Sequence, residues 1–212
     1  MILIQKGKAP NSLVQYKYQF DASFNNLPSV VKNDIRTALL EEQGFLCAYC
    51  MKAIDDKSMK IEHYQARTPD NELDYKNLLA CCSGGEQFGE YSERTCDTYK
   101  EDKVLHIDPQ NINHTRTISY RSSDGTIQSS LEFSNELSDI LNLNSALLKT
   151  ARKDIIDALD NMIGKKFGSK PCSKSYLQTL LNKYSSRVNN HNTSFLGVYL
   201  WYLTKKIRQC RA

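Results

Sequence analysis

The hydrophobic positions follow a helical period at both ends of the chain and lose it in the middle. Over residues 28–43 apolar side chains recur at helical spacing, at Val31, Ile35, Leu39 and Leu40. Pro28 stands at the front of this stretch and Gly44 behind it, which are start and stop signals of one helix. Residues 1–27 are polar with scattered aromatic residues and no sustained period. We expect them to form an arm that packs on, or contacts, another surface.

Helical spacing returns after residue 134 in three stretches. In the first, which Asn144 could cap and Gly164 could end, one face carries Leu147, Leu148, Ala151, Ile155, Leu159 and Met162. Residues 173–187 and 194–208 are also amphipathic, so we expect a C-terminal bundle of three helices. Before them, residues 118–133 alternate on both sides of Ser123-Asp124-Gly125, which is typical of a β-hairpin.

Between residues 44 and about 110 short segments alternate with turn-rich stretches, including residues 53–58 and 83–89. A module of this size buries too little apolar area to be secure unaided, so a structural metal would have a clear energetic purpose. The pattern therefore predicts an α+β protein in three regions. These are an N-terminal arm and helix (1–43), a metal-dependent module (44–115), and a hairpin followed by a helical region (116–212).

Composition excludes few classes. The 212 residues are 40% hydrophobic and 25% charged, as in ordinary globular proteins, and no apolar stretch approaches the length of a membrane span. The first residues become polar too early for a secretion signal, so we expect a cytoplasmic protein without a membrane role. The net charge of +4 permits nucleic-acid binding without demonstrating it.

The seven cysteines are an odd number and include a CxxC pair, which favours reduced thiols that hold a metal. The short loop between Cys47 and Cys50 can bring both sulfurs to one tetrahedral zinc. Cys82 and Cys96 would complete the site, although spacing alone does not distinguish Cys82 from Cys81. The simpler alternative is that the later cysteines are buried small side chains. We expect Cys172 and Cys210, in the helical region, not to be ligands.

A second set of chemically active side chains is interleaved with these thiols. His63 directly follows Glu62 on a short predicted strand, and Asn77 comes fourteen residues later, before Leu78-Leu79. Asp97 directly follows Cys96. The other three histidines have no such context. The alternative for Glu62 and Asp97 is that both are solvated surface charges.

These residues resemble the HNH, or ββα-metal, nucleases, in which a two-stranded hairpin and a helix surround one divalent cation. The matching motifs are Cys47-Ala-Tyr-Cys50, Glu62-His63, Asn77-Leu78, Cys82 and Cys96-Asp97-Thr98-Tyr99-Lys100. The resemblance implies that His63 is the general base. It implies that Glu62 and Asp97 bind a catalytic Mg²⁺ or Mn²⁺, although the position of Asp97 is usually His or Asn. Asn77 would hold the loop and the base in place.

Further motifs resemble the PtuB type of HNH nuclease, the effector of retron-linked and Septu-type antiphage defence. They are residues 45–50, Glu62-His63-Tyr64, residues 78–82 and Leu141-Asn142-Leu143-Asn144. The resemblance implies a nuclease that works with a PtuA-like ATPase of the ABC or structural-maintenance type. In retrons a reverse transcriptase and its small multicopy DNA would join them.

Basic residues surround the motif, and we expect Arg67, Lys76, Arg94 and Lys100 to bind substrate phosphates. The alternative is a solvated face. A basic run at Lys205, Lys206, Arg208 and Arg211 could likewise bind nucleic acid or end a helix. The sequence thus predicts a metal-dependent endonuclease that cuts DNA or a cellular RNA such as tRNA. The alternative function is a non-catalytic, zinc-stabilised adaptor that binds nucleic acid or an ATPase.

Overall fold

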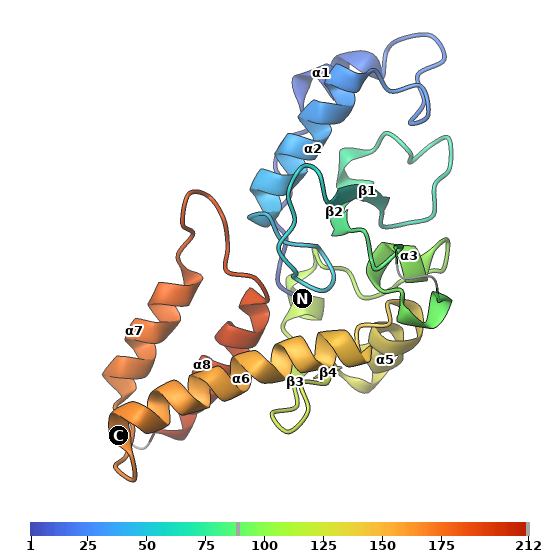
Figure 1. Cartoon of the computed structure of the whole chain (residues 1–212). Helices are drawn as coiled ribbons and strands as arrows, with labels where there is room; N and C mark the ends of the chain where they lie inside the picture. Colours follow the sequence, from blue (N-terminus) through green and yellow to red (C-terminus); the bar gives the residue numbers. More distant parts are fainter. Residues whose placement is uncertain (88–89, 211–212) are drawn as a thin grey trace.

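The computed structural model describes residues 1–87 and 90–210 and shows an α+β protein (Figure 1). Within them, two small antiparallel sheets, β1 with β2 and β3 with β4, lie among helices of very different length. The end of the predicted turn-rich stretch at residues 88–89, and Arg211 of the basic run, lie outside the described residues. None of the helices in these ranges combines the length and the apolar character that crossing a bilayer requires.

The predicted N-terminal helix is confirmed as α2 (Ser29–Gln43). Pro28 occupies its N-cap, where a fixed φ suits a helix start, and Gly44 ends it in the left-handed conformation at φ 59°. Ile35 and Leu39 are fully buried, as the spacing requires. The left-handed conformation of Gly44 ends α2, and the chain reaches Cys47 three residues later.

The central module contains β1 (Met59–His63) and β2 (Leu78–Cys82), which pair antiparallel with Glu62 opposite Leu79 and His63 opposite Leu78. A long loop joins them and ends in a 3₁₀ turn, η1 (Tyr75–Asn77). All five residues of β2 are buried, and α2 packs against this strand. After a second 3₁₀ turn, η2 (Tyr91–Glu93), the short helix α3 (Cys96–Lys100) contacts β2. The β1–β2 hairpin and α3 are therefore in contact through β2.

The predicted hairpin at residues 118–133 exists but is shorter. After α4 (Ile112–Thr115), β3 (Ser119–Tyr120) pairs with β4 (Ile127–Gln128), and Gly125 turns the chain between them at φ 73°. Residues beyond β4 leave the strand and form α5 (Leu131–Asn135) and the π-helical turn η3 (Glu136–Ile140). The alternation therefore predicts the hairpin correctly up to Gln128, and the prediction of strand beyond Gln128 is wrong.

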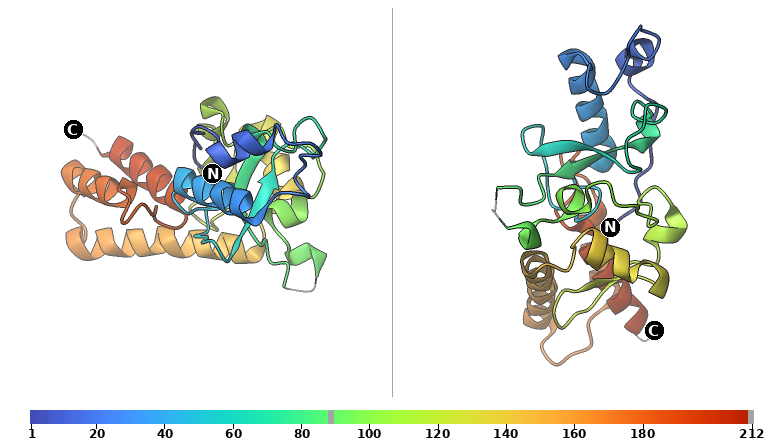
Figure 2. Two further views of the ribbon diagram at one scale, coloured as in Figure 1. Left: turned by 90° about the horizontal axis from the view of Figure 1, so that it is seen from above. Right: turned by 90° about the vertical axis from the view of Figure 1, so that its right-hand side faces the viewer.

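Three C-terminal helices form where the spacing predicts them. They are α6 (Ala146–Phe167), α7 (Lys174–Ser185) and α8 (Leu196–Gln209), and α8 packs against both others. Figures 1 and 2 show them gathered at the opposite end of the molecule from α1 and α2.

Several details of α6 differ from the prediction. The helix continues through Gly164 and ends at Gly168, and Ser145 rather than Asn144 is its N-cap. The side chain of Asn144 instead bonds both backbone groups of Ile127. Leu147, predicted on the buried face, is 68% exposed, and Met162 is also exposed. The sequence period located the helix but not its exact boundaries.

The N-terminal arm has structure that the sequence did not reveal. It contains α1 (Asn11–Tyr16), whose Leu13 and Tyr16 are buried and which packs on α2. Before α1 the chain runs alongside the module, where the Ile4 amide donates to the carbonyl of Pro109 and the Lys6 ammonium donates to that of Leu78. The expectation that the arm packs on another surface is therefore met within the chain itself.

The start of α8 is fixed to the module. The Phe195 amide donates to the Met51 carbonyl at 2.7 Å. At Gly197 a Cβ would approach the Met51 sulfur to 2.7 Å, so any larger residue there would displace the end of the Met51 side chain. The start of α8 therefore contacts Met51, in the loop that follows Cys50.

Candidate metal site and active site

Four buried thiols converge at the centre of the module. The Sγ atoms of Cys47, Cys50, Cys82 and Cys96 all lie within 4.8 Å of one another. The Cys47–Cys96 and Cys50–Cys82 pairs are each separated by 3.8 Å. Sulfurs at the corners of a tetrahedron with Zn–S bonds of about 2.3 Å would be about 3.8 Å apart. The thiols are thus arranged as a tetrahedral metal site requires.

The loop after α2 forms the first half of this site. The Cys47 amide donates to the Lys52 carbonyl, and the Met51 amide donates back to Cys47. The Lys52 amide points at the Cys50 sulfur at 3.4 Å. Met51 takes a positive φ of 64°, which closes the turn. An amide aimed at the sulfur favours the thiolate form that binds metal.

The other two thiols come from β2 and α3. Cys82 ends β2, whereas Cys81 is not among the four convergent thiols. The Cys81 thiol interacts with that of Cys47, but it is not one of the four sulfurs that lie within 4.8 Å of one another. Cys172 and Cys210 also lie elsewhere, as expected, and Cys210 donates to the carbonyl of Cys172.

The chemistry of this donor set fits a thiophilic cation. Hydrogen bonding with Cys47, together with burial, raises the pKa of Cys50 and of Cys96 well above the ordinary thiol value. Deprotonation of Cys50 and Cys96 therefore requires positive charge at the centre of the cluster. Zinc would supply that charge and bind the four sulfurs.

A second cluster of charged groups surrounds Glu62 of β1. Glu62 is only 5% exposed, and its Oε1 lies 2.9 Å from the Lys100 ammonium, itself 1% exposed. The Tyr49 hydroxyl donates to the same oxygen at 3.0 Å. Lys100 ends α3 and Tyr49 lies between the first two cysteines. The cluster thus shares its supporting segments with the thiols.

Asp97 of α3 belongs to this cluster. Burial, and then the neighbouring Asp97 carboxylate, raise the pKa of Glu62 to about 9. The Asp97 carboxylate thus disfavours ionisation of Glu62, and a hard divalent cation between the two would stabilise the charged form of Glu62. Asp97 is half-buried and therefore accessible from one side. The solvated-surface alternative does not describe Glu62, which lies in the interior.

His63, the next residue of β1, is half-buried and held by its surroundings. Its Nε2 lies 3.0 Å from the Glu72 carbonyl, and the ring packs edge-on against Phe24 at 4.5 Å. Because a carbonyl only accepts, Nε2 carries the proton and Nδ1 of the neutral ring is free. Burial lowers the pKa of His63, and the nearby Arg67 lowers it further. The neutral imidazole is thus available to take a proton.

Asn77 is buried at the end of the β1–β2 loop. Its Oδ1 accepts from the Gln65 amide at 2.8 Å, and its Nδ2 donates to the Gln65 carbonyl at 3.1 Å. The Asn77 carbonyl also accepts from the Tyr64 amide. These three bonds hold the two residues that follow His63.

The four basic residues proposed as phosphate contacts differ in their accessibility. Arg67 and Lys76 are exposed, and Arg67 donates to Asn25 at 2.8 Å. Arg94 is half-buried, with its Cζ 5.7 Å from the Tyr91 ring centroid. Lys100 is enclosed, and its ammonium contacts Glu62 and the His63 carbonyl. In this structure Lys100 faces the carboxylates rather than the surface.

Sequence reasoning missed several supporting residues. Tyr49 and Phe24 had no assigned role, although Tyr49 stands within the CxxC motif. Leu141-Asn142-Leu143-Asn144 appeared only as part of a resemblance. Its Leu141 carbonyl accepts from the Cys96 amide at 2.9 Å, and Asn142 donates to the Arg94 carbonyl at 2.7 Å. This segment therefore holds the last cysteine in place.

Comparison with known proteins agrees with this site. The chain is 28% identical over 121 residues to a protein of Escherichia coli named "Retron Ec83 putative HNH endonuclease". The match covers 47% of this chain and 47% of the relative, so the chain spans about half the length of that protein. No family model matches. The comparison supports an HNH nuclease and, with it, a nuclease function.

Proposed function

We propose that this protein is a metal-dependent HNH endonuclease of the PtuB type that hydrolyses phosphodiester bonds of nucleic acid. The observation that supports the proposal is the buried Glu62, which interacts with Asp97 and directly precedes His63 on β1, in the same module as the four thiols. The order β1, β2, α3 along the chain supports this proposal, because a ββα-metal site consists of a hairpin followed by a helix. The retron relative supports the same class.

Each residue has a defined role in the proposal. Glu62 and Asp97 would hold Mg²⁺ or Mn²⁺, which would supply Lewis-acid stabilisation of charge on the scissile phosphate and the leaving 3′ oxygen. Nδ1 of His63 takes a proton from the attacking water, so the product carries a 5′ phosphate. Lys100 balances the charge on Glu62. Structural zinc at Cys47, Cys50, Cys82 and Cys96 fixes the start of α3, and with it Asp97.

We further propose that this nuclease acts as the toxic effector of an antiphage defence complex. Its partners would be a PtuA-like ATPase and, in a retron, a reverse transcriptase with its small multicopy DNA. In this proposal Arg67, Lys76 and Arg94 would contact the substrate backbone. Both DNA and tRNA carry the phosphodiester chemistry that such a site requires.

The proposal is tested by incubating the protein, alone and with the ATPase, with plasmid or total tRNA in Mg²⁺ or Mn²⁺. We expect cleavage that His63→Ala reduces by about a hundredfold or more. His191→Ala is the matched control, because that exposed ring stacks on Phe45 outside the site. If the His63→Ala variant cleaved as fast as the wild type, His63 would be excluded as the general base. Absence of cleavage in every combination, with zinc bound, would instead favour a non-catalytic adaptor.

A further inference from the structure

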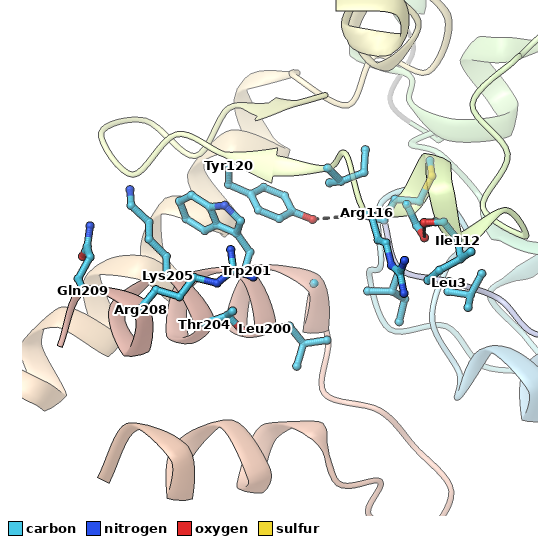
Figure 3. Close-up of a pocket in the computed structure, with 15 residues that line it drawn as sticks. Leu3, Ile112, Arg116, Tyr120, Leu200, Trp201, Thr204, Lys205, Arg208 and Gln209 are labelled. Carbon is cyan, nitrogen blue, oxygen red and sulfur yellow. Dashed lines mark hydrogen bonds between the residues drawn. The ribbon is translucent and has the colours of Figure 1, made fainter. Parts of the chain in front are cut away.

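A cavity of about 620 Å³ lies between α8, α4, β3 and the N-terminal arm (Figure 3). Its walls come from Met1–Leu3, from residues 112–120 and from one face of α8. None of the residues placed in the proposed active site lines it. The proposed nuclease chemistry therefore leaves this cavity unexplained.

Every charged side chain in the lining is a cation. The three are Arg116, Lys205 and Arg208. Over the described ranges, none of them pairs with a carboxylate. The C-terminal basic run is divided by the helix, since Lys206 turns away and pairs with Asp160 at 3.1 Å. Positive charge is thus concentrated on the cavity, which favours an anionic ligand.

The remaining lining is aromatic and apolar. The Trp201 and Tyr120 rings are arranged edge-on, with their centroids 5.6 Å apart. The Lys205 ammonium lies 5.0 Å from the centroid of the Trp201 ring. Figure 3 shows Trp201 in the middle, with Arg116 on one side and Lys205 with Gln209 on the other. Leu3, Ile112 and Leu200 add apolar surface. A flat ring system would find both a stacking partner and an apolar floor.

We infer that this cavity binds a nucleotide, either free or as an unpaired nucleotide of a nucleic-acid strand. The cations would contact phosphate, and Trp201 would stack on the base. To free the indole face for stacking, the Lys205 ammonium would move away from the ring. Thr204 and Gln209 offer polar groups for the base edges. The volume lies within the range of about 300–1,000 Å³ found for small-ligand pockets. This binding does not depend on the proposed nuclease activity.

Trp201 gives a direct measurement, because it is the single tryptophan of the chain. The full-length protein is titrated with AMP, with oligo(dT) or with an oligoglutamate peptide, without added divalent cation so that nothing is hydrolysed. We expect saturable quenching of tryptophan fluorescence by AMP, by oligo(dT) or by both. Quenching by AMP identifies a free-nucleotide site, and quenching by oligo(dT) alone identifies a strand site. No quenching by either, or equal quenching by oligoglutamate, would overturn the inference.

Variants locate the binding. Arg116→Gln and Arg208→Gln should each weaken binding of a labelled oligo(dT) or AMP several-fold and reduce the dependence of log affinity on log salt by about one. Trp201→Leu should weaken it about fivefold or more, whereas Trp201→Phe should retain most of it. The control is Lys174→Gln, an exposed lysine at the start of α7. An equal loss in the control, or no loss in the arginine variants, would contradict the inference.

Discussion

The free Nδ1 of His63 determines the pH range in which the proposed reaction can run. Burial and Arg67 lower the pKa of this imidazole, so it loses its proton at a lower pH than an ordinary histidine. The turnover number in saturating Mg²⁺ should therefore stay high as pH falls through the usual histidine range, and decline only below it. A profile of initial cleavage rate against pH tests this. A decline at or above the usual histidine value would contradict it.

Arg67 provides a second test of the same ring. Replacing Arg67 with Gln removes a positive charge that disfavours the imidazolium, so the pKa of His63 should rise. The acidic limb of the turnover profile should then move to higher pH. Lys76→Gln is the control, because Lys76 is an exposed cation that is not among the groups that shift His63. An identical profile in both variants would remove Arg67 from this role.

The buried Lys100 and Glu62 depend on each other. Lys100→Met should lower the free energy of unfolding by about 3 kcal/mol, because it leaves a buried carboxyl group without its partner. The double variant with Glu62→Gln should recover part of that loss. Urea unfolding of the wild type, both single variants and the double variant measures the coupling. Additive losses would show that the two side chains contribute independently.

The roles of Lys100 and Tyr49 illustrate the limit of residue-level prediction. Spacing identified the thiols because a metal imposes distances along the chain. It gave no information on which way a lysine at the end of a five-residue helix would point. Lys100 was expected to contact substrate, yet it lies in the interior. Burial depends on segments far away in sequence, which no local pattern encodes.

At the scale of one element, only one of the two adjacent cysteines of β2 belongs to the four-thiol cluster. Cys82→Ser should lose zinc, because Cys82 is one of the four convergent thiols, whereas Cys81→Ser should keep it. Metal content by mass spectrometry of the folded proteins distinguishes the two. Full zinc occupancy in Cys82→Ser would exclude this sulfur as a ligand. Cys81→Ser serves as the internal control for a buried thiol of the same strand.

The longer helices could be predicted and the shortest elements could not. The helices α2, α7 and α8 are long enough to show several turns of apolar spacing, and Pro28 and Gly44 mark both ends of α2. By contrast, α1 has six residues and β3 has two, which is too little for a period. Their positions depend on tertiary contacts. The apolar alternation beyond β4 predicted a strand, but these residues form the short helix α5.

At the scale of the molecule, the four-thiol cluster joins three separate segments. If zinc occupies it as proposed, its removal by a chelator should lower the Tm by at least about 10 °C, because binding of a structural metal contributes its free energy to folding. Calorimetry with and without chelator measures the change. Adding Mg²⁺ back should not restore stability, whereas adding zinc should. An unchanged Tm would show that the four thiols pack well without a metal.

The architecture as a whole was predictable only in outline. The α+β class and the order of arm, module and helical region follow from where the helical period disappears. The contact of α8 with the loop after Cys50 does not, because it rests on the absence of a side chain at Gly197. The cavity beside Trp201 also needed the fold, since its cations come from two regions distant in sequence.

The bond from the Cys96 amide to the Leu141 carbonyl has a consequence for biosynthesis. The last thiol is held by chain that leaves the ribosome well after Cys96 itself. The bond from Asn142 to the Arg94 carbonyl, and the bond from the Ile127 amide to Asn144, also form only after these asparagines are synthesised. A nascent chain that ends before residue 141 should thus lack the support that holds Cys96 beside the other three thiols. Assembly of the four-thiol cluster would therefore wait until most of the chain has been translated.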